Sequence, residues 1–337
     1  MPDLRLLMVR LSSMGDIVHT LPSLAALRDA YPNAQIDWVV ERKWAELLEG
    51  CTQLNTVIPQ DRGLRPTLRL IGELRARRYD VALDFQGLYK SAALALVSGA
   101  KRRIGLDAAH AREPGAARFY NQRVSPQGAH VVEMNLSLAR AAGATAVSPP
   151  QLSLPIAPAA DAFLDLQLES RQLKDYYVIS PGGGWRSKCW PAEQYGHLHR
   201  KLAERHGWRG VVTYGPGERA LAEAVRLVAG EPEPFVLGTD IAQLKALLRR
   251  AKFLVAADSG PLHLAAALGT PLVGLYGPTD PKRNGPYGQL DYVVRNATDD
   301  QISYKRTGEY SPLMLSIKVE QVIAAIERRM GTENAER

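Results

Sequence analysis

The stretch that decides the fold is LRLLMVRLSSMGDIVHTLPSLAALRDAYPNAQIDWVV, residues 4–40. Its first eight residues form an apolar run that predicts a strand, and residues 35–40 predict a second one. Between them, residues 16–32 repeat apolar side chains at helical spacing. A helix between two strands is typical of a parallel sheet with helices on both faces.

The same alternation continues along the chain. Residues 65–78 predict a helix with Leu68, Ile71 and Leu74 on one face, and residues 79–85 predict a third strand. Residues 146–163 are rich in Pro and Ala without a period, which predicts a linker. Further strands, separated by amphipathic helices, are predicted at 176–180, 210–215, 252–258, 271–277 and 291–295. We therefore expect an α/β protein with two doubly wound domains that face a central cleft and bind ligands at the carboxyl ends of their strands.

Composition narrows the class of protein. Hydrophobic residues make up 46% of the 337 residues and charged residues 23%, as in soluble globular proteins. The two cysteines, Cys51 and Cys189, have no zinc-site spacing. We expect free thiols in a reducing cytoplasm, with one long-range disulfide as the alternative. Arg5 and Arg10 interrupt the first apolar run, so we expect no signal peptide. The chain has no stretch of about 18 apolar residues, so we expect no membrane span.

The formal net charge is +7, which indicates either a surface adapted for solubility or a surface that binds an anionic partner. Basic residues occur only in short clusters, without a long tail or an aromatic-interleaved stripe. This distribution favours a phosphorylated small molecule or an anionic membrane face over nucleic acid.

The first strand-to-helix junction carries polar side chains where ligands are expected. Gly15 permits a tight turn there, and Asp16 opens the following helix. Asp16 is interpreted either as a helix cap or as a general base at the carboxyl end of the strand. Ser12 and Ser13 are candidates to bind a polar ligand at the same edge.

The second junction is the glycine-rich segment SPGGGWRSKCWP, residues 180–191. Gly183 and Gly184 leave backbone N–H groups accessible, and Lys188 adds a mobile charge, a combination suited to phosphate binding. The segment lacks the P-loop pattern, and a flexible loop is the alternative.

The third junction runs from Asp258 into a helix that begins near Pro261. The N–H groups near Ser259 and Gly260 are expected to bind a pyrophosphate, and Asp258 to hold sugar hydroxyls. His263 lies in the first turn, where it is either structural or a neutral donor to phosphate.

A further segment, residues 215–220, fits the G-x-G-x-x-A fingerprint of dinucleotide-binding proteins. Pro216 and the position of the segment on a later strand argue against that interpretation. Glu218 alternatively takes the ribose hydroxyls of a nucleotide. The chain contains no Asp-x-Asp motif, the usual clamp for a metal–pyrophosphate complex.

Several of these segments together resemble glycosyltransferase family 9, the ADP-heptose:lipopolysaccharide heptosyltransferases. The matching segments cover both halves of the chain in order and are SSMGDIVHTLPSL, IDWVVE, YDVALDFQGLYKSAAL, AREPGAARFYN, KCWPAEQY, DSGPLHLAAALG and LYGPTDP.

The resemblance implies a GT-B fold of two Rossmann-like domains. We expect an acceptor-binding domain at 1–150, a linker at 151–172 and a nucleotide-sugar-binding domain at 173–315. A C-terminal helix at 316–330 is expected to pack back on the first domain.

The resemblance also implies roles for single residues. Asp16 matches the catalytic base, Lys188 the lysine at the donor phosphates, and Glu218 the acid at the ADP ribose. Asp258 matches the carboxylate that contacts heptose, and Ser259, Gly260 and His263 match the phosphate-binding helix start. Many relatives carry hydroxyl residues where this chain has Gly183 and Gly184. The remaining expected acceptor contacts are Ser12, Ser13, Arg62, Arg65, Arg69 and Arg112.

The implied reaction is an inverting, metal-independent transfer of L-glycero-D-manno-heptose from ADP-heptose to Kdo of the lipid A-Kdo acceptor. ADP-heptose is then a substrate, and no cofactor is expected. The enzyme is expected to be a cytoplasmic monomer at the inner leaflet of the membrane. The alternatives are another family 9 enzyme such as heptosyltransferase II, an NAD-dependent oxidoreductase using Gly215 and Gly217, and a non-catalytic sugar-nucleotide-binding module.

Overall fold

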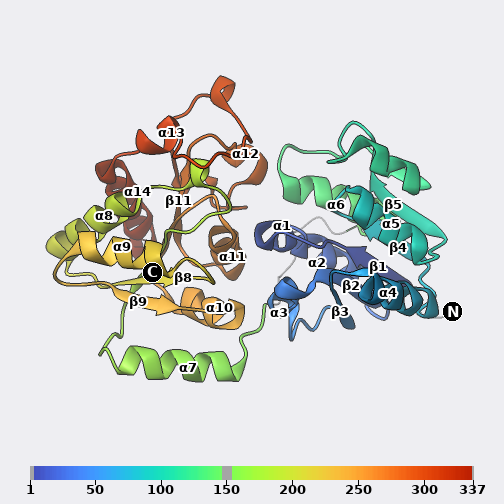
Figure 1. Ribbon diagram of the computed structural model, residues 1–337, viewed down its shortest axis with the longest axis horizontal. Helices are drawn as coiled ribbons and strands as arrows, with labels where there is room; N and C mark the ends of the chain where they lie inside the picture. The colour runs from blue at the N-terminus through green and yellow to red at the C-terminus, as the bar shows by residue number, and fades with distance from the viewer. Residues whose placement is uncertain (1–3, 146–153, 336–337) are drawn as a thin grey trace. The chain divides into compact units, whose positions relative to one another are not determined.

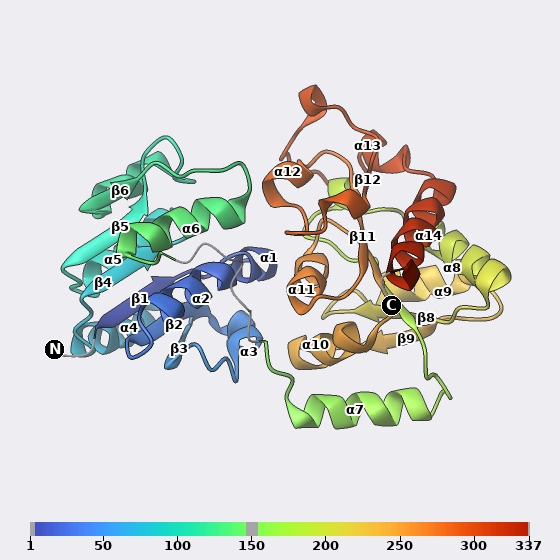
Figure 2. The ribbon, with the colours of Figure 1, turned by 180° about the vertical axis from the view of Figure 1, so that it is seen from behind.

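The computed structural model describes residues 4–145 and 154–335. The chain forms two compact units, Met1–Pro155 and Ile156–Arg337 (Figure 1). In each unit, helices cover both faces of a central sheet (Figure 2).

The first unit is built on a six-stranded sheet in the order β3-β2-β1-β4-β5-β6. All neighbouring strands run parallel. The strands are β1 (Arg5–Val9), β2 (Gln35–Glu41), β3 (Thr56–Gln60), β4 (Val81–Asp84), β5 (Arg102–Leu106) and β6 (Gln122–Val124). The helices are α1 (Met14–Val18), α2 (Leu21–Ala30), η1 (Arg42–Trp44), α3 (Ala45–Leu48), α4 (Leu64–Ala76), α5 (Tyr89–Val97), η2 (Pro114–Phe119) and α6 (Val131–Ala142).

The second unit repeats this plan with the order β12-β11-β10-β7-β8-β9, again all parallel. The strands are β7 (Tyr177–Ser180), β8 (Gly210–Tyr214), β9 (Phe235–Gly238), β10 (Leu254–Ala257), β11 (Leu272–Tyr276) and β12 (Val293–Arg295). The helices are α7 (Pro158–Glu169), η3 (Arg186–Lys188), α8 (Ala192–His206), α9 (Arg219–Ala229), α10 (Ile241–Arg250), α11 (Gly260–Leu268), α12 (Pro281–Asn284), η4 (Leu290–Tyr292), η5 (Asp299–Gln301), α13 (Pro312–Leu315) and α14 (Val319–Ala335).

Both sheets reverse their strand order beside their first strand, between β1 and β4 and between β7 and β10. This is the strand order of doubly wound nucleotide-binding sheets, which bind ligands beyond the carboxyl ends of the strands where the order reverses. The prediction of two doubly wound parallel sheets is therefore confirmed. The fold also points to the loops after these four strands as the place to look for chemistry.

Helix α7 occupies residues for which the Pro- and Ala-rich composition predicts a linker. Ala160, Leu164 and Leu168 recur every fourth residue and are buried. Helix α7 lies beside α10, and the two helices pack together (Figure 1). The Pro residues mislead because Pro158 stands in the first turn of the helix, where its missing N–H costs nothing.

Helix α4 has a different buried face from the predicted one. Leu70 and Leu74 are buried, whereas Leu68 is 58% exposed, so the prediction that Leu68 shares a face with Leu74 is wrong. Residues four apart lie on one helical face, and Leu70 and Leu74 form such a pair. Leu64 and Leu68 form a second pair that points away from the core, with Leu64 76% exposed.

Helix α14 belongs to the core of the second unit. Val322, Ile323 and Ile326 are buried in the same cluster as Trp190 of the second sheet's first connection. The helix packs on α8, β11 and β12. Packing of this segment on the first domain stays a prediction.

Two glycines of the first unit offer a test of packing. A Cβ at Gly105 in β5 would lie 2.3 Å from the Tyr120 ring, whereas a Cβ at Gly72 in α4 would meet no atom within 4 Å. We expect Gly105→Ala to destabilise the protein by about 1–3 kcal/mol through overpacking. The matched change Gly72→Ala should stabilise it by up to about 1 kcal/mol, because alanine is the better helix former. Urea unfolding followed by circular dichroism measures both, and equal effects would contradict the packing described.

Candidate active site

The loop after β1 holds a carboxylate between a cation and a helix start. Arg10 is 7% exposed, and one of its guanidinium nitrogens lies 2.7 Å from Asp16 Oδ1. The backbone N–H and the hydroxyl of Ser13 each donate to Asp16 Oδ2 at 3.0 Å. Ser13 is the N-cap of α1, and Asp16 is the third helical residue of a capping box. Asp16 is thus part of the cap and also holds an ion pair.

These contacts fix the charge of Asp16. Burial raises the pKa of the Asp16 carboxyl, but Arg10 and the two Ser13 hydrogen bonds outweigh burial and lower this pKa to about 2. A depressed pKa means that the carboxylate stabilises the fold at neutral pH and loses that contribution only as the pH falls through about 2. The side chain keeps 30% of its surface exposed, so a ligand can reach part of it.

The loop after β4 supports this arrangement from the neighbouring strand. Arg10 donates to the backbone carbonyl of Phe85, and the Gln86 side chain accepts from the backbone N–H of Leu11 at 2.8 Å. Asp84, at the end of β4, is fully buried and accepts from Tyr120 at 2.6 Å and from Ser91 at 2.8 Å. Burial raises the pKa of Asp84. The two loops at the reversal of the first sheet therefore form one hydrogen-bonded structure.

The predicted acceptor residues lie around this edge of the first sheet. Ser12 is half-buried beside Ser13, and Arg112 is exposed on a segment whose backbone packs against Gly87 in the loop after β4. Arg62, Arg65 and Arg69 are exposed on α4 and the loop before it. This loop follows β3, two strands from β1, so it begins about 10 Å from the loop of Asp16, at about 4.8 Å per strand.

In the second unit, the side chains at the reversal converge on Asp258. This carboxylate follows β10, is 2% exposed and lies 3.2 Å from Lys188 Nζ through its Oδ2 atom. His263 Nε2 lies 3.3 Å from Oδ1, and the Asn284 side-chain N–H donates to Oδ2 at 3.2 Å. Burial raises the pKa of Asp258, but His263, Lys188 and Thr279 outweigh burial and hold the pKa well below its usual range.

The predicted phosphate-binding elements lie beside this carboxylate. Ser259 is the N-cap of α11, and its hydroxyl is buried without a hydrogen-bond partner among the described residues. Gly260 begins the helix, so its N–H is among the groups that have no partner within the helix. Lys188 ends η3 and is 8% exposed. His263 contacts Asp258, as a structural histidine would.

The glycine-rich loop packs against the loop after β8. A Cβ at Gly182 would lie 2.2 Å from Glu218 Oε1, so any larger residue there would have to displace this carboxylate. Glu218 also accepts from the backbone N–H of Gly215 at 3.1 Å. Cβ atoms at Gly183 and Gly184 would lie 2.8 Å from Cys189 Sγ and 3.8 Å from Lys188 Cε. The structure therefore brings Glu218, the glycines and Lys188 together.

Trp185 carries two cations on its ring. Lys188 Nζ lies 4.2 Å from the ring centroid, and the Arg306 guanidinium lies 4.8 Å from it. Ser187 donates to the carbonyl of Lys305 at 3.2 Å, so the segment around Arg306 packs on η3. These contacts restrain Lys188 in addition to its ion pair.

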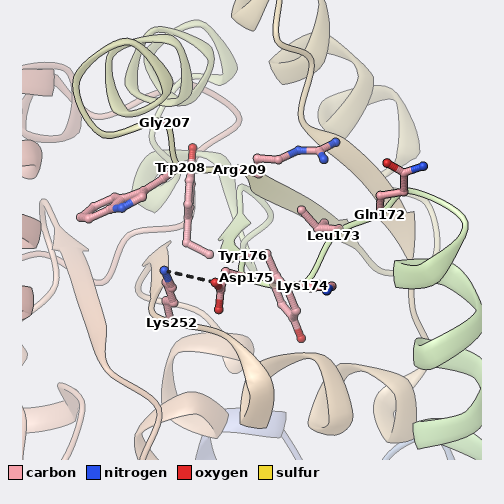
Figure 3. A pocket seen from close by; sticks show the side chains of 10 residues that line it. Gln172, Leu173, Lys174, Asp175, Tyr176, Gly207, Trp208, Arg209 and Lys252 are labelled. Carbon is pink, nitrogen blue, oxygen red and sulfur yellow. Dashed lines mark ion pairs between the residues drawn. The ribbon is translucent and has the colours of Figure 1, made fainter.

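A pocket of about 300 Å³ lies elsewhere in the second unit (Figure 3). It is lined by residues at the amino ends of β7 and β8, including Tyr176, Arg209 and Lys252, and Lys252 pairs with Asp175 at 3.9 Å. This is the opposite edge of the sheet from Lys188 and Asp258. Doubly wound sheets bind ligands at the carboxyl edge, so this pocket is not part of the candidate site.

Among the residues of these groups that sequence reasoning missed are Arg10, Gln86 and Asn284. Arg10 lies near the end of the run predicted as the first strand, and Gln86 directly follows the third predicted strand, so strand ends were a signal for both. Asn284 carries no such signal, since its role depends on a contact between connections that are far apart in the sequence. In the described part of the chain, no group of three or more His, Cys, Asp or Glu side chains is placed to hold a metal ion. Nor does that part contain a helix long and apolar enough to cross a membrane.

Comparison with known proteins gives one family. Residues 67–313 match the model of glycosyltransferase family 9 (heptosyltransferase). Lipopolysaccharide heptosyltransferase 1 of Pseudomonas aeruginosa is 35% identical over 330 residues, which cover 92% of this chain and 88% of the relative. The Escherichia coli K12 protein of the same name is 34% identical over 321 residues, covering 89% of this chain and 96% of the relative.

Solved structures agree with this result. The structure of E. coli heptosyltransferase WaaC with ADP matches 97% of this chain and 100% of its own, with a TM-score of 0.75 and 30% identity. A glycosyl transferase family 9 structure from Veillonella parvula has a TM-score of 0.82 at 24% identity, covers 97% of both chains and shows the shared fold. The chain thus has the GT-B fold of the heptosyltransferases, belongs to glycosyltransferase family 9 and is a glycosyltransferase.

Proposed function

We propose that this enzyme transfers L-glycero-D-manno-heptose from ADP-heptose to Kdo of the lipopolysaccharide inner core, with inversion at the anomeric carbon. The observation that carries the proposal is the likeness to heptosyltransferase 1 proteins over nine-tenths of the chain. Solved WaaC structures contain ADP and ADP-2-deoxy-2-fluoro heptose. The direct test is ADP release from ADP-heptose with a panel of Kdo-lipid acceptors.

Asp16 is the proposed general base. An inverting transfer is a single displacement in which the acceptor hydroxyl loses one proton as the new bond forms. Arg10 and Ser13 keep Asp16 ionised, at the expense of its strength as a base. The hydroxyl becomes acidic only as the bond forms, so we infer that a weak but permanently charged base accepts the proton late.

The leaving group is ADP, which needs positive potential and no proton. Lys188 and the N–H groups at the start of α11 supply it in our proposal, with no metal ion. Glu218 is proposed to bind the ribose hydroxyls and Asp258 the heptose hydroxyls. Gly183 and Gly184 would contact the phosphates through backbone N–H groups only, since they have no side chain.

Helix α4 is proposed to lie on an anionic membrane surface, where the acceptor lipid resides. Its exposed leucines, Leu64 and Leu68, stand beside exposed Arg65 and Arg69, while Glu73 pairs with Arg77 at 2.8 Å. Leucines that enter the interface beside arginines that bind lipid phosphates suit such a surface. The same arginines, with Arg62, Arg112, Ser12 and Ser13, are the proposed acceptor contacts.

The main alternative is a family 9 enzyme with another acceptor, such as heptosyltransferase II. The acceptor panel separates it from our proposal. An NAD-dependent oxidoreductase is disfavoured, because Gly215 and Gly217 follow β8, which is not at the reversal of strand order. A non-catalytic module is disfavoured by the accessible, ionised Asp16.

We expect Asp16→Asn to lower the turnover number by roughly 10²–10⁴-fold, the usual contribution of a general base. Asparagine has the same shape and keeps an oxygen that can accept the Ser13 hydrogen bonds, so the helix cap should survive. Initial rates of ADP release measure the effect, and circular dichroism checks the fold. A folded variant with nearly full activity would show that Asp16 is only a cap.

We expect the initial rate of ADP release to be unchanged by EDTA, because the protein itself supplies the positive potential. Loss of activity in EDTA that Mg²⁺ restores would instead mean that carboxylates such as Asp258 bind a cation.

We expect Lys188→Ala to weaken ADP-heptose binding by about 1.5–3 kcal/mol, as expected for the loss of a hydrogen bond to a charged group. Calorimetric titration measures this affinity. Lys174→Ala is the control for loss of a lysine at the opposite edge of the sheet.

We expect the double variant Leu64→Ser and Leu68→Ser to bind about tenfold more weakly to vesicles of phosphatidylethanolamine and phosphatidylglycerol, because two apolar side chains no longer enter the interface. Vesicle sedimentation measures the bound fraction. The matched control is Leu166→Ser with Leu227→Ser, whose leucines are 67% and 71% exposed on α7 and α9. Equal binding by both double variants would contradict a role for α4.

A further inference from the structure

Asn284 is positioned by two hydrogen bonds, one through its side chain and one through its backbone. It ends α12, which follows β11, the strand next to β10. Its side-chain N–H donates to Asp258 Oδ2 at 3.2 Å, and its backbone carbonyl accepts from the Tyr276 hydroxyl at 3.2 Å. The backbone and the amide group are therefore both fixed.

The contact with Asp258 decides which way the amide points. An ionised carboxylate has no proton and can only accept hydrogen bonds, so the NH₂ group must face it. Lys188 and His263 on the same carboxylate keep it ionised. Asn284 Oδ1 consequently points away from Asp258 as a fixed acceptor.

This oxygen is buried and has no hydrogen-bond partner among the described residues. The same is true of the hydroxyl of Ser259, a residue that is 7% exposed and follows Asp258 directly. Buried polar atoms without partners are rare in folded proteins, and a missing ligand is one reason for them. These two atoms, one on a residue that donates to Asp258 and one on the residue that follows Asp258 in the chain, indicate a site that a ligand completes.

The chemistry of Asn284 Oδ1 selects the ligand group. A diphosphate at neutral pH offers acceptor oxygens, which an amide oxygen repels. A sugar hydroxyl offers a proton to donate, which an amide oxygen accepts.

We propose that Asn284 is a specificity-determining residue whose Oδ1 accepts a hydrogen bond from a hydroxyl of the donor's sugar. This inference rests on the proposed function, since it takes the ligand to be an ADP-sugar. It assigns Asn284 to the sugar and not to the ADP part of the donor.

The test compares two ligands that differ by the sugar. The dissociation constants of ADP and of ADP-heptose are measured by calorimetry for the wild type and for Asn284→Ala. We expect ADP-heptose to bind the variant about threefold to tenfold more weakly, as expected for the loss of one hydrogen bond, with ADP binding unchanged. Unchanged ADP binding also shows that the variant is folded.

Arg283→Ala is the matched control, because this exposed neighbour lies on the same helix and should leave both constants unchanged. Equal weakening of ADP and ADP-heptose by Asn284→Ala would assign Asn284 a structural role and overturn the proposal. Unchanged binding of both ligands would mean that only water reaches Oδ1, which also overturns it. If the wild type releases no ADP from ADP-heptose with any Kdo-lipid acceptor, the proposed function itself fails.

Discussion

The second unit depends on one buried charge. Asp258 is almost fully inside the protein, where an unpaired carboxylate would be very unfavourable. Its partners come from three separate connections: Lys188 after β7, His263 on α11 and Asn284 after β11. The charge therefore specifies how these three connections meet at the edge of the sheet, and the amide orientation of Asn284 follows from it.

The first unit also has a paired carboxylate in the loops where its strand order reverses. The carboxylate of Asp16 is more accessible, and Arg10 is the buried partner. Because parallel strands all end at one edge, the loop after β4 reaches the loop after β1 and holds Arg10 and Leu11 through Phe85 and Gln86. In both units, two neighbouring strand ends at the reversal of order position the charged groups.

The sequence predicts the fold well where strands are buried on both faces. β1, β7, β10 and β11 read as continuous apolar runs, as expected for central parallel strands. The predictions missed β3, β5, β6 and β9, which are short or carry Pro, Arg or Gln. Tertiary pairing stabilises them, and no local pattern records it.

The candidate site shows the same division. Asp16, Lys188 and Asp258 were predicted because each stands at the end of a predicted strand or in the connection after it. Gln86 has the same kind of position, directly after a predicted strand, whereas Asn284 matters only through its contact with Asp258 from another connection. The pairing of Glu218 with the glycine loop likewise depends on β7 and β8 being neighbours. Strand ends can be predicted from a single sequence, whereas contacts between loops cannot.

The ion pair between Lys188 and Asp258 bears on the timing of the proposed catalytic cycle. If Lys188 binds the donor phosphates as proposed, these phosphates compete with the Asp258 carboxylate for one ammonium group. That competition would limit how tightly any diphosphate is held, including the one left after transfer. In the proposed reaction, Asp258 takes back the lysine as ADP departs, so the site clears itself for the next round and is less prone to being blocked by its own product.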